Sequence, residues 1–251
     1  MEKKGIIALA LSAGRVPENA GQRIREAADG REVVITTDKE QMEKIIGRVE
    51  IAAGDFPVSL AGAAGSLRWF HQWYAGADWL QKHPEAKELS FIITTSSGIH
   101  GRQMTEHLFG LLIAWHRRFP EVFAARERRE WLKLSHGDVG LLTGRTMLIL
   151  GYGAIGEQVA RVAQAFDMRV IGLRRTPGKG HPPAGADRVV GYDRLPDVLP
   201  EADIVVDILP YTPDTRGFVG REEFAAMKRT ALFANIGRGK TVDEDALAAA
   251  V

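Results

Sequence analysis

The sequence predicts an α/β fold with two parallel sheets, one in each of two domains. Short apolar runs alternate with amphipathic stretches through the first hundred residues, and the same alternation starts again after residue 141. A longer stretch with helical periodicity, from residue 103 to about 119, separates the two alternating regions. Strands that alternate with helices are typical of parallel sheets whose faces are covered by those helices. We therefore expect one domain over residues 1–100 and a second over residues 101–251.

The composition is that of a globular protein and excludes several functional classes. Hydrophobic residues make up 45% and charged residues 26% of the 251 residues, which is enough apolar material to bury real cores. The 33 Lys and Arg nearly balance the 32 Asp and Glu, so we expect no broad basic face for nucleic acid or a membrane surface. Cysteine is absent, which excludes disulfides, thiolate catalysis and cysteine-ligated zinc, and fits a cytoplasmic location.

In the first domain, five apolar runs are strand candidates and three stretches between them are helix candidates. The first run, Ile6 to Leu9, follows two lysines and so also resembles the start of a signal peptide. We favour a buried strand because the run is short and a helical pattern follows at once. The predicted strands are GIIAL (5–9), EVVIT (32–36), VEIAA (49–53), LRWFHQW (67–73) and SFIITT (90–95), and the predicted helices are 18–28, 39–47 and 59–65.

A long helix is predicted between the two domains. The apolar residues with helical spacing are Met104, Leu108, Leu111, Leu112, Trp115 and Phe119. The charged stretch that follows, up to Trp131, contains Arg and Glu residues whose charges largely cancel. We interpret this stretch as a solvent-exposed helix face. A contact with a partner subunit near Trp131 is the alternative.

The second domain repeats the alternation of strands and helices. Its predicted strands are 146–150, 169–173, 187–190, 203–208 and 231–235, and its predicted helices are 155–166, 194–199 and 221–228. The last strand runs into an Asn-Ile-Gly-Arg-Gly turn, and a short alanine-rich helix begins at Thr241 to Asp243. A helix of barely two turns is not stable alone in water, so we expect it to pack on a neighbouring element.

A glycine-rich turn in the second domain indicates a dinucleotide site. Gly151, Gly153 and Gly156 form the pattern G-x-G-x-x-G between the apolar strand TMLIL and an amphipathic helix. The pattern alone is common, but a strand before it and a helix after it are specific for dinucleotide binding. The first glycine permits a tight turn, the second lets a pyrophosphate approach the backbone, and the third lets helix and strand pack closely. The free N–H groups of the helix start would face the phosphates.

The end of the next strand indicates which dinucleotide is bound. NAD sites usually place Asp or Glu there, where the carboxylate accepts a hydrogen bond from the ribose 2′-hydroxyl. This sequence instead has Arg174, Arg175 and Thr176. Two arginines and a hydroxyl suit a 2′-phosphate, which a carboxylate would repel. We therefore favour NADP over NAD, with NAD possible; two ordinary surface arginines at a strand end are the alternative.

Five stretches together resemble the D-isomer-specific 2-hydroxyacid dehydrogenase family. They occur in the family's order and spacing and cover nearly all of the chain. They are YAGAD (74–78), MTEHLFGLLIAWHRR (104–118), GYGAIG (151–156), LPYTPDT (209–215) and NIGRG (235–239). The resemblance implies a flavodoxin-like substrate-binding domain at the N-terminus and a Rossmann coenzyme domain after it. It also implies an active site in the cleft between the two.

The resemblance assigns roles to matching residues. Arg238 corresponds to the family arginine that holds the substrate carboxylate and polarises the keto group, a task that suits the two-pronged guanidinium. The backbone of Ala75 and Gly76 corresponds to the loop that receives the substrate carboxylate. Leu209, Pro210 and Thr215 match a loop beside the adenosine half of the cofactor. The full set expected at the cofactor is Gly151, Gly153, Ala154, Ile155, Gly156, Arg174, Arg175, Thr176, Leu209, Pro210, Thr215, Ile236 and Gly237.

The resemblance also implies that part of the family's active site is missing. Reduction of a keto group needs a proton donor, and the family uses a histidine paired with a carboxylate. Both lie in the family after the helix that begins here at Asp243, so we expect a truncated chain with an incomplete coenzyme sheet and slow or no turnover. His100 is the best substitute among the seven histidines, whereas His107 and His116 on the long helix are expected to serve packing or hydrogen bonding.

These expectations define an oxidoreductase that transfers hydride between NADP(H) and a small 2-oxoacid such as glyoxylate or hydroxypyruvate. The alternative is a non-catalytic, dimeric NAD(P)-binding scaffold or sensor, although such a protein would not need Arg238 and the YAGAD loop. The family implies a homodimer. Neither nucleic acid nor a membrane is expected as a partner. No metal site is expected, because no two histidines have zinc-binding helical spacing.

Overall fold

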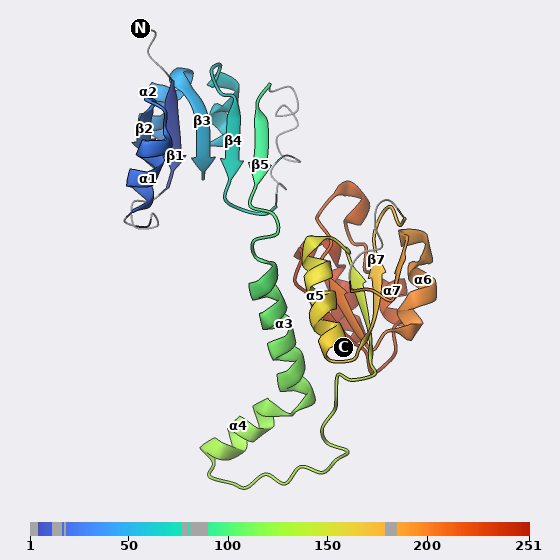
Figure 1. Cartoon of the computed structure of the whole chain (residues 1–251). Helices are drawn as coiled ribbons and strands as arrows, with labels where there is room; N and C mark the ends of the chain where they lie inside the picture. The colour runs from blue at the N-terminus through green and yellow to red at the C-terminus, as the bar shows by residue number, and fades with distance from the viewer. Residues whose placement is uncertain (1–4, 12–16, 18, 77–79, 81–89, 179–184) are drawn as a thin grey trace. The chain divides into compact units, whose positions relative to one another are not determined.

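The structure is a computed structural model that describes residues 5–11, 17, 19–76, 80, 90–178 and 185–251. The chain divides into two compact units, Met1–Ile99 and His100–Val251 (Figure 1). Among the described residues, no helix has both the length and the apolar character needed to span a membrane.

The first unit contains a five-stranded parallel sheet. Its strands are β1 (Ile6–Ala10), β2 (Glu32–Ile35), β3 (Val49–Gly54), β4 (Trp69–Gln72) and β5 (Ile92–Thr95). The strand order is β2-β1-β3-β4-β5, and every neighbouring pair is parallel. This is the flavodoxin-like order. All five predicted strands of this unit are present, with ends that differ by at most a few residues.

Two α-helices connect strands of this sheet. α1 (Ala20–Ala27) lies between β1 and β2, and α2 (Lys39–Ile45) lies between β2 and β3. Asp38 caps α2, because its side chain accepts hydrogen bonds from the N–H groups of Glu40 and Gln41. The core on one side of the sheet joins β1, α2, β3 and the chain before β4, and includes Ile6, Ala8, Met42, Val49, Ala52 and Phe70.

The helix predicted for residues 59–65 is present over residues 58–63, as a 3-10 helix. The buried residues that follow one another here are Ala61, Ala64 and Leu67. Ala61 lies within the 3-10 helix, Ala64 follows its last residue, and Leu67 lies in the chain before β4.

The second unit is also built on a five-stranded parallel sheet. Its strands are β6 (Thr146–Leu150), β7 (Arg169–Leu173), β8 (Arg188–Val190), β9 (Ile204–Asp207) and β10 (Leu232–Asn235). Their order is β10-β9-β6-β7-β8, all parallel. Numbered from β6, this is the order 3-2-1-4-5 of the Rossmann fold. The ends predicted for β6 and β7 agree with the structure residue by residue.

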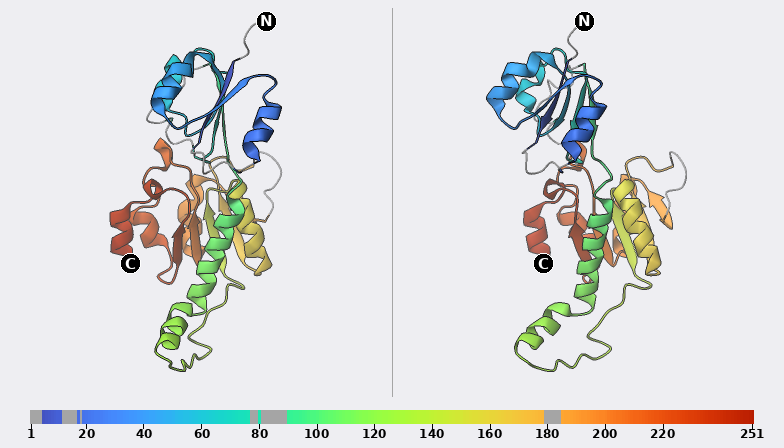
Figure 2. Two further views of the ribbon diagram at one scale, coloured as in Figure 1. Left: turned by 90° about the vertical axis from the view of Figure 1, so that its left-hand side faces the viewer. Right: turned by 60° about the vertical axis from the view of Figure 1, so that its left-hand side comes forward.

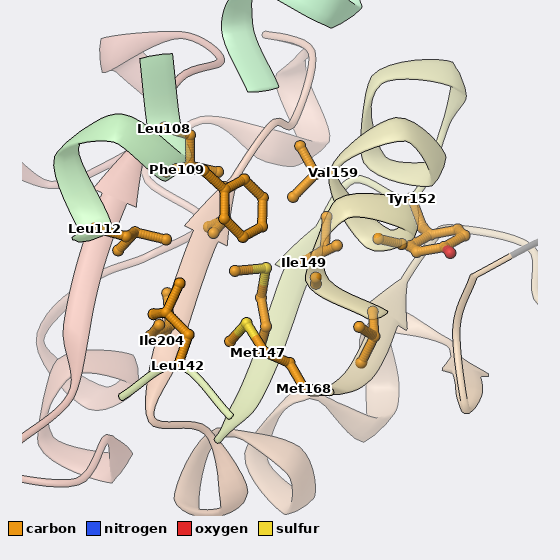
Figure 3. Close-up of a cluster of buried hydrophobic side chains, with 14 residues drawn as sticks. Leu108, Phe109, Leu112, Leu142, Met147, Ile149, Tyr152, Val159, Met168 and Ile204 are labelled. Atoms are coloured by element: carbon orange, nitrogen blue, oxygen red, sulfur yellow. The ribbon is translucent and has the colours of Figure 1, made fainter. Parts of the chain in front are cut away.

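Helices cover both faces of this sheet. Alternate residues of β6 point to opposite faces, so Met147 and Ile149 join one core while Leu148 and Leu150 join the other. Helices α3 (Gly101–His116) and α5 (Ala154–Ala165) cover the first face (Figure 3). The second face is covered by α6 (Leu195–Val198), α7 (Arg221–Ala226) and α8 (Glu244–Ala250). The short alanine-rich helix α8 therefore has the packing partners that its length requires.

The long helix predicted from residue 103 to about 119 is present but ends earlier, and a second helix lies in the charged stretch after it. α3 ends at His116, and α4 (Phe119–Glu127) begins after Arg118, whose φ of 57° breaks the helical path. Pro120 requires the break, because proline lacks an N–H and clashes with the preceding turn in a helix interior but is tolerated in a first turn. α3 lies beside α5, with the Phe109 and Phe166 rings stacked at 5.5 Å (Figure 2). α4 and residues 128–141 extend away from this sheet.

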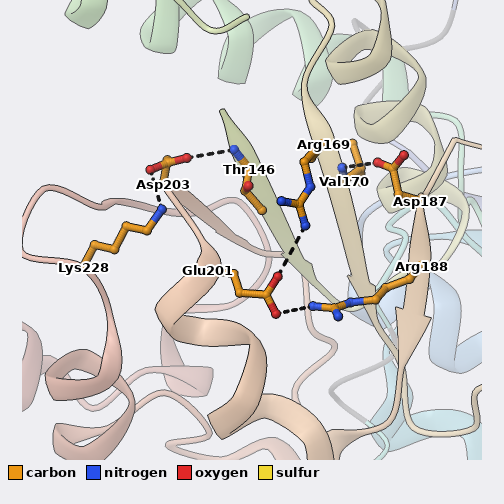
Figure 4. Close-up of polar contacts among 8 residues, drawn as sticks. All are labelled: Thr146, Arg169, Val170, Asp187, Arg188, Glu201, Asp203 and Lys228. Atoms are coloured by element: carbon orange, nitrogen blue, oxygen red, sulfur yellow. Dashed lines mark hydrogen bonds and ion pairs between the residues drawn. The ribbon is translucent and has the colours of Figure 1, made fainter. Parts of the chain in front are cut away.

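At the amino ends of the strands of the second sheet, carboxylates accept hydrogen bonds and form ion pairs (Figure 4). Asp203 accepts hydrogen bonds from the Thr146 N–H at 2.9 Å and the Lys228 ammonium at 2.8 Å, and Asp187 accepts one from the Val170 N–H at 2.6 Å. Glu201 bridges Arg188 and Arg169. The hydrogen bond from Arg188, followed by the contact with Arg169, holds the pKa of the Glu201 carboxyl below its usual value. Hydrogen bonds and ion pairs within the chain thus occupy these groups at the amino edge of the sheet.

Candidate functional site

The opposite edge of the second sheet, at the carboxyl ends of its strands, carries the candidate site. β6 and β9 pair from Met147–Ile204 through Leu150–Asp207, so the chain leaves both strands at the same level. β6 connects onward to β7 on one side, while β9 lies on its other side. Open α/β sheets bind ligands at such a point, where the strand order reverses.

The three glycines of the G-x-G-x-x-G turn have three different environments. Gly151 has a φ of 95°, and a β-carbon there would lie 2.9 Å from the Ile208 carbonyl. A β-carbon on Gly156 would lie 3.0 Å from the Gly151 oxygen. Gly153 is exposed, precedes α5 as its N-cap, and has open space where a β-carbon would be. The first and third glycines are therefore required by packing within the chain, whereas the second leaves room for a ligand.

The start of α5 has the features of an anion-binding helix terminus. The first N–H groups of any α-helix lack partners within the helix, and the helix dipole adds partial positive charge. Ala154 is exposed in this first turn, while Ile155 is half-buried and packs against the core. Gly153 has no side chain that would cap these groups. The arrangement therefore suits a phosphate ester at this position.

The end of β7 carries the predicted arginines. Arg174 follows the strand directly, is half-buried, and its N–H donates to the Val190 carbonyl at 3.0 Å. Arg175 and Thr176 are exposed. Burial raises the pKa of Tyr192, and the positive charge of Arg175 opposes this increase. The edge beside the glycine turn is therefore cationic at the position where NAD sites have an acid.

The loop after β9 is ordered by its own hydroxyl groups. Leu209 is buried, and its N–H donates to the Asp207 carboxyl at 2.9 Å. The Thr215 hydroxyl donates to the Pro210 carbonyl at 2.6 Å and is within reach of Thr212. Thr215 is buried, so in this structure it shapes the loop, and Pro210 is the exposed member of the predicted set here.

The turn after β10 presents Arg238. Ile236 and Gly237 donate backbone hydrogen bonds to the Asp207 carbonyl at 3.0 and 3.1 Å, which ties this turn to the end of β9. A β-carbon on Gly237 would lie 2.9 Å from the Leu209 oxygen, so the two loops are in direct contact. Arg238 is half-buried and extended, and its Nη1 donates to the Gly237 carbonyl at 3.0 Å.

The predicted substrate loop lies in the first unit. Ala75 and Gly76 are half-buried and follow β4. The buried side chain of Gln72 donates hydrogen bonds to the carbonyls of Tyr74, at 3.4 Å, and Gly76. Sequence reasoning missed this anchor, although a polar residue at the end of a buried strand was its signal. Asp78 of the YAGAD stretch lies outside the described residues.

The histidines differ in their burial and in their hydrogen-bond partners. His116 is buried and its Nδ1 lies 2.8 Å from the Leu112 carbonyl, consistent with a packing and hydrogen-bonding role. His100 is exposed at the start of α3, and His107 is exposed on the same helix. His71 contacts Thr94 at 2.8 Å within the first sheet. His83 and His181 lie outside the described residues. In the described part of the chain, no group of three acidic or histidine side chains is arranged to hold a metal ion.

The two parallel sheets and the glycine turn define a two-unit α/β protein of the dinucleotide-binding class. Residues 109–251, more than half of the chain, match the D-isomer specific 2-hydroxyacid dehydrogenase, NAD binding domain. The chain belongs to this family.

Curated relatives show the same relationship. The glyoxylate reductase of Aeropyrum pernix is 35% identical over 173 residues, which are 66% of this chain and 50% of that protein. The D-3-phosphoglycerate dehydrogenase of Methanocaldococcus jannaschii is 32% identical over 163 residues, 64% of this chain and 30% of that protein. The glyoxylate reductase of Thermococcus onnurineus is 28% identical over 253 residues, 96% of this chain and 75% of that protein. The chain thus spans half or less of the first two relatives.

Solved structures share the fold over nearly the whole chain. A D-isomer specific 2-hydroxyacid dehydrogenase family protein from Aeromonas salmonicida matches with a TM-score of 0.81 and 29% identity, covering 98% of this chain and 77% of that one. A D-isomer specific 2-hydroxyacid dehydrogenase from Xanthobacter autotrophicus, in complex with NADPH and MES, matches with a TM-score of 0.79 and 26% identity, covering 98% and 76%.

Proposed function

We propose that this protein is an NADP(H)-preferring reductase of small 2-oxoacids. In this proposal the second unit binds the coenzyme, and the first unit binds substrate through the backbone of Ala75 and Gly76. The observation that carries the proposal is the position of Arg238, which lies at the carboxyl edge of the second sheet on a turn fixed to the end of β9.

The coenzyme half of the proposal assigns each group a task. Gly153 and the first N–H groups of α5 would hold the pyrophosphate, and Arg174 and Arg175, with Thr176 as a further donor, would hold a ribose 2′-phosphate. The loops after β9 and β10, including Leu209, Pro210, Ile236 and Gly237, would border the rest of the cofactor. The cofactor supplies the hydride when it is bound.

The substrate half depends on Arg238. A guanidinium binds the two oxygens of a carboxylate with two parallel hydrogen bonds, and its charge also stabilises negative charge that develops on a neighbouring keto oxygen. Relatives named glyoxylate reductase and hydroxypyruvate reductase support a substrate of this size. The Xanthobacter autotrophicus protein, which has the same fold, was solved in complex with NADPH, and this supports the choice of coenzyme.

The test is the rate of NADPH oxidation with glyoxylate and with hydroxypyruvate, measured beside NADH. Turnover that is faster with NADPH than with NADH supports both halves of the proposal. Tight NADPH binding without turnover with any 2-oxoacid supports the second candidate, an NAD(P)-binding scaffold or sensor. One observation favours that candidate: His100, which precedes α3 beside the first turn of α5, is exposed, and among the described residues no carboxylate contacts it that would orient it as a proton donor.

We also propose that two copies associate through α3, α4 and the segment after them. Large apolar side chains are exposed along this region, including Leu111 at 58%, Trp115 at 63%, Phe123 at 56% and Trp131 at 89%. Large exposed apolar patches often mark protein–protein interaction sites. Arg and Glu residues between these side chains allow complementary pairing across a two-fold axis.

A further inference from the structure

A buried carboxyl group lies directly beneath the Arg238 turn. Asp207 is the last residue of β9 and is 0% exposed; within the described residues it is the one Asp or Glu that is fully buried. An ionised carboxylate is costly to bury unless a cation pairs with it. The hydrogen-bond partners of the Asp207 side chain are neutral: a backbone N–H, a hydroxyl and a side-chain amide. Burial raises the pKa of Asp207 by more than these hydrogen bonds lower it.

The contacts of Asp207 lead to the main chain of Arg238. The Oδ1 atom accepts from the Leu209 N–H at 2.9 Å. The Oδ2 atom lies 2.6 Å from the Thr241 hydroxyl and 3.3 Å from the Asn235 Nδ2. Both of those side chains also reach the Arg238 carbonyl, Thr241 at 2.5 Å and Asn235 at 3.1 Å. The Arg238 carbonyl is therefore held by two side chains that Asp207 itself holds.

The number of protons decides which form of Asp207 fits. The Thr241 hydroxyl has one hydrogen but lies within 2.6 Å of two acceptor oxygens, on Asp207 and Arg238. If Asp207 were ionised, one of these short contacts would join two lone pairs. If Asp207 is protonated, its Oδ2–H donates to Thr241, and the Thr241 O–H donates to the Arg238 carbonyl. Only the neutral acid gives every short contact a hydrogen.

We propose that Asp207 is a positioning residue for Arg238, acting as a neutral acid through the Thr241 hydroxyl to fix the turn that presents the guanidinium. This inference rests on the proposed function, in which Arg238 binds the 2-oxoacid carboxylate. Asp207 itself touches neither substrate nor cofactor in this proposal. Its carboxyl fixes the side chains, and its carbonyl accepts from Ile236 and Gly237 of the same turn.

The first experiment compares Thr241→Val with Thr241→Ser in the full chain. Binding of oxamate, an unreactive 2-oxoacid analogue, is measured by calorimetry at saturating NADPH. Thr241→Val keeps the shape but removes the hydroxyl, so oxamate binding should weaken roughly tenfold or more, the cost of a lost buried hydrogen bond. Thr241→Ser keeps the hydroxyl and should bind within about threefold of wild type. NADPH affinity should change little in both variants.

The second experiment tests the protonation state. Asp207→Asn places an amide N–H where the acid O–H would donate, while its oxygen can still accept from Leu209. Asp207→Asn should therefore keep oxamate binding, whereas Asp207→Ala should lose it roughly tenfold or more. If Asp207→Asn is as weak as Asp207→Ala, the neutral-acid form is wrong. If neither differs from wild type, the positioning role is wrong.

Hydrogen exchange of the backbone amides from Gly237 to Thr241 provides a readout that does not need substrate. Exchange should accelerate in Thr241→Val and not in Thr241→Ser. Thr105→Val is the matched control, because Thr105 is a buried threonine whose hydroxyl donates to the Gly101 carbonyl within α3. It should leave both exchange and oxamate binding unchanged. If wild type with NADPH binds no oxamate, the proposed function fails, and exchange alone decides whether Asp207 and Thr241 hold the turn; equal exchange in all variants would overturn the inference.

Discussion

Gly151, the first residue after β6, lies against Ile208, the first residue after β9, so closely that a β-carbon on Gly151 would be 2.9 Å from the Ile208 carbonyl carbon. The two strands are neighbours in the sheet but are separated by more than fifty residues of chain. The contact therefore closes the sheet at the point where its strand order reverses. It also explains why Gly151 is required mainly by packing within the chain and less by contact with a ligand.

Replacement of Gly151 and of Gly153 should separate these two roles. Gly151→Ala adds a β-carbon against Ile208 and imposes a φ of 95° on an L-residue, so it should lower the free energy of unfolding by about 2–4 kcal/mol. Gly153→Ala meets open space and should change stability by less than about 1 kcal/mol. It should nevertheless weaken NADPH binding at least tenfold, since the methyl group occupies the phosphate position. Urea unfolding and cofactor titration measure both; an unchanged NADPH affinity in Gly153→Ala would place the pyrophosphate elsewhere.

The arginines after β7 should set the coenzyme preference. Simultaneous replacement of Arg174 and Arg175 by Ala removes charge-assisted hydrogen bonds to a 2′-phosphate, each worth about 1.5–3 kcal/mol. The dissociation constant of NADPH should rise at least tenfold, and that of NADH should change by less than about threefold. The control is the double variant Arg169→Ala and Arg188→Ala, which removes the same charge from the opposite edge of the sheet. Equal losses for NADPH and NADH would show that Arg174 and Arg175 do not discriminate between the coenzymes.

Much of the fold could be predicted because buried parallel strands are continuous apolar runs. TMLIL and RVIGL are bounded by polar or turn-forming residues, and both were predicted to the residue as β6 and β7. The break at Arg118 was missed because the apolar spacing continues through Phe119, and the periodicity concealed the signal that Pro120 gives. The sequence predicted a helix at 59–65 but not its 3-10 type, because three-residue and 3.6-residue spacings differ little over one or two turns.

The residues of the candidate site that belong to a sequence motif could be predicted. The residues that are brought together from distant strands could not. The glycine turn could be found because the spacing of its glycines, between a strand and a helix, indicates dinucleotide binding. The link between Asp207 and Thr241 joins residues 34 apart and depends on β9 and β10 being neighbours in the sheet. Its one signal was a charged residue at the end of an otherwise apolar strand, IVVD. Gln72, which holds the loop through Gly76, gave a similar signal at the end of β4.

Substitutions of Arg238 should distinguish the effect of its positive charge on substrate binding from the effect of its planar, two-pronged shape. Arg238→Lys keeps the positive charge but loses the planar fork, so oxamate binding in the presence of NADPH should weaken about tenfold. Arg238→Gln loses the charge as well and should weaken binding about a hundredfold. Both variants should retain NADPH affinity. Calorimetry provides these values, with Arg221→Lys on the exposed start of α7 as the control. Oxamate binding that survives Arg238→Gln would show that another group holds the carboxylate.

Charges introduced on α3 should disrupt the proposed dimer. Leu111 and Trp115 are four residues apart on the same helix and more than half exposed. The double variant Leu111→Glu and Trp115→Glu would bury two carboxylates in an apolar interface, a cost of several kcal/mol. Light scattering should then give the mass of one chain, 27.5 kDa, instead of twice that value. Gln164→Glu on the exposed side of α5 should leave the mass at that of the dimer. A wild-type chain that is monomeric at all concentrations would exclude this interface.

The two aspartates at the ends of β9 should affect stability with opposite dependence on pH. Burial raises the pKa of Asp207 above its usual value of 3.8, so the folded chain binds a proton more tightly than the unfolded chain. Its stability contribution is present below pH 3.8 and decreases as pH rises through the folded-state pKa. Asn does not titrate, so Asp207→Asn should become more stable relative to wild type as pH rises through this window, and then the difference should level off.

Asp203, just before β9, provides the matched comparison. Burial acts to raise its pKa, but hydrogen bonds from Lys228 and Thr146 outweigh that effect and lower it below 3.8. The unfolded chain then binds the proton more tightly, so wild type gains stability as pH rises toward and through the unfolded value. Asp203→Asn should therefore become less stable relative to wild type as pH rises up to about the unfolded value of 3.8, and the difference should level off above it. Urea unfolding of the three proteins from about pH 2 to about pH 8 measures both differences. If the two differences change in the same direction, Asp207 is not held as a neutral acid, and the chain of hydrogen bonds through Thr241 to Arg238 must begin with a carboxylate.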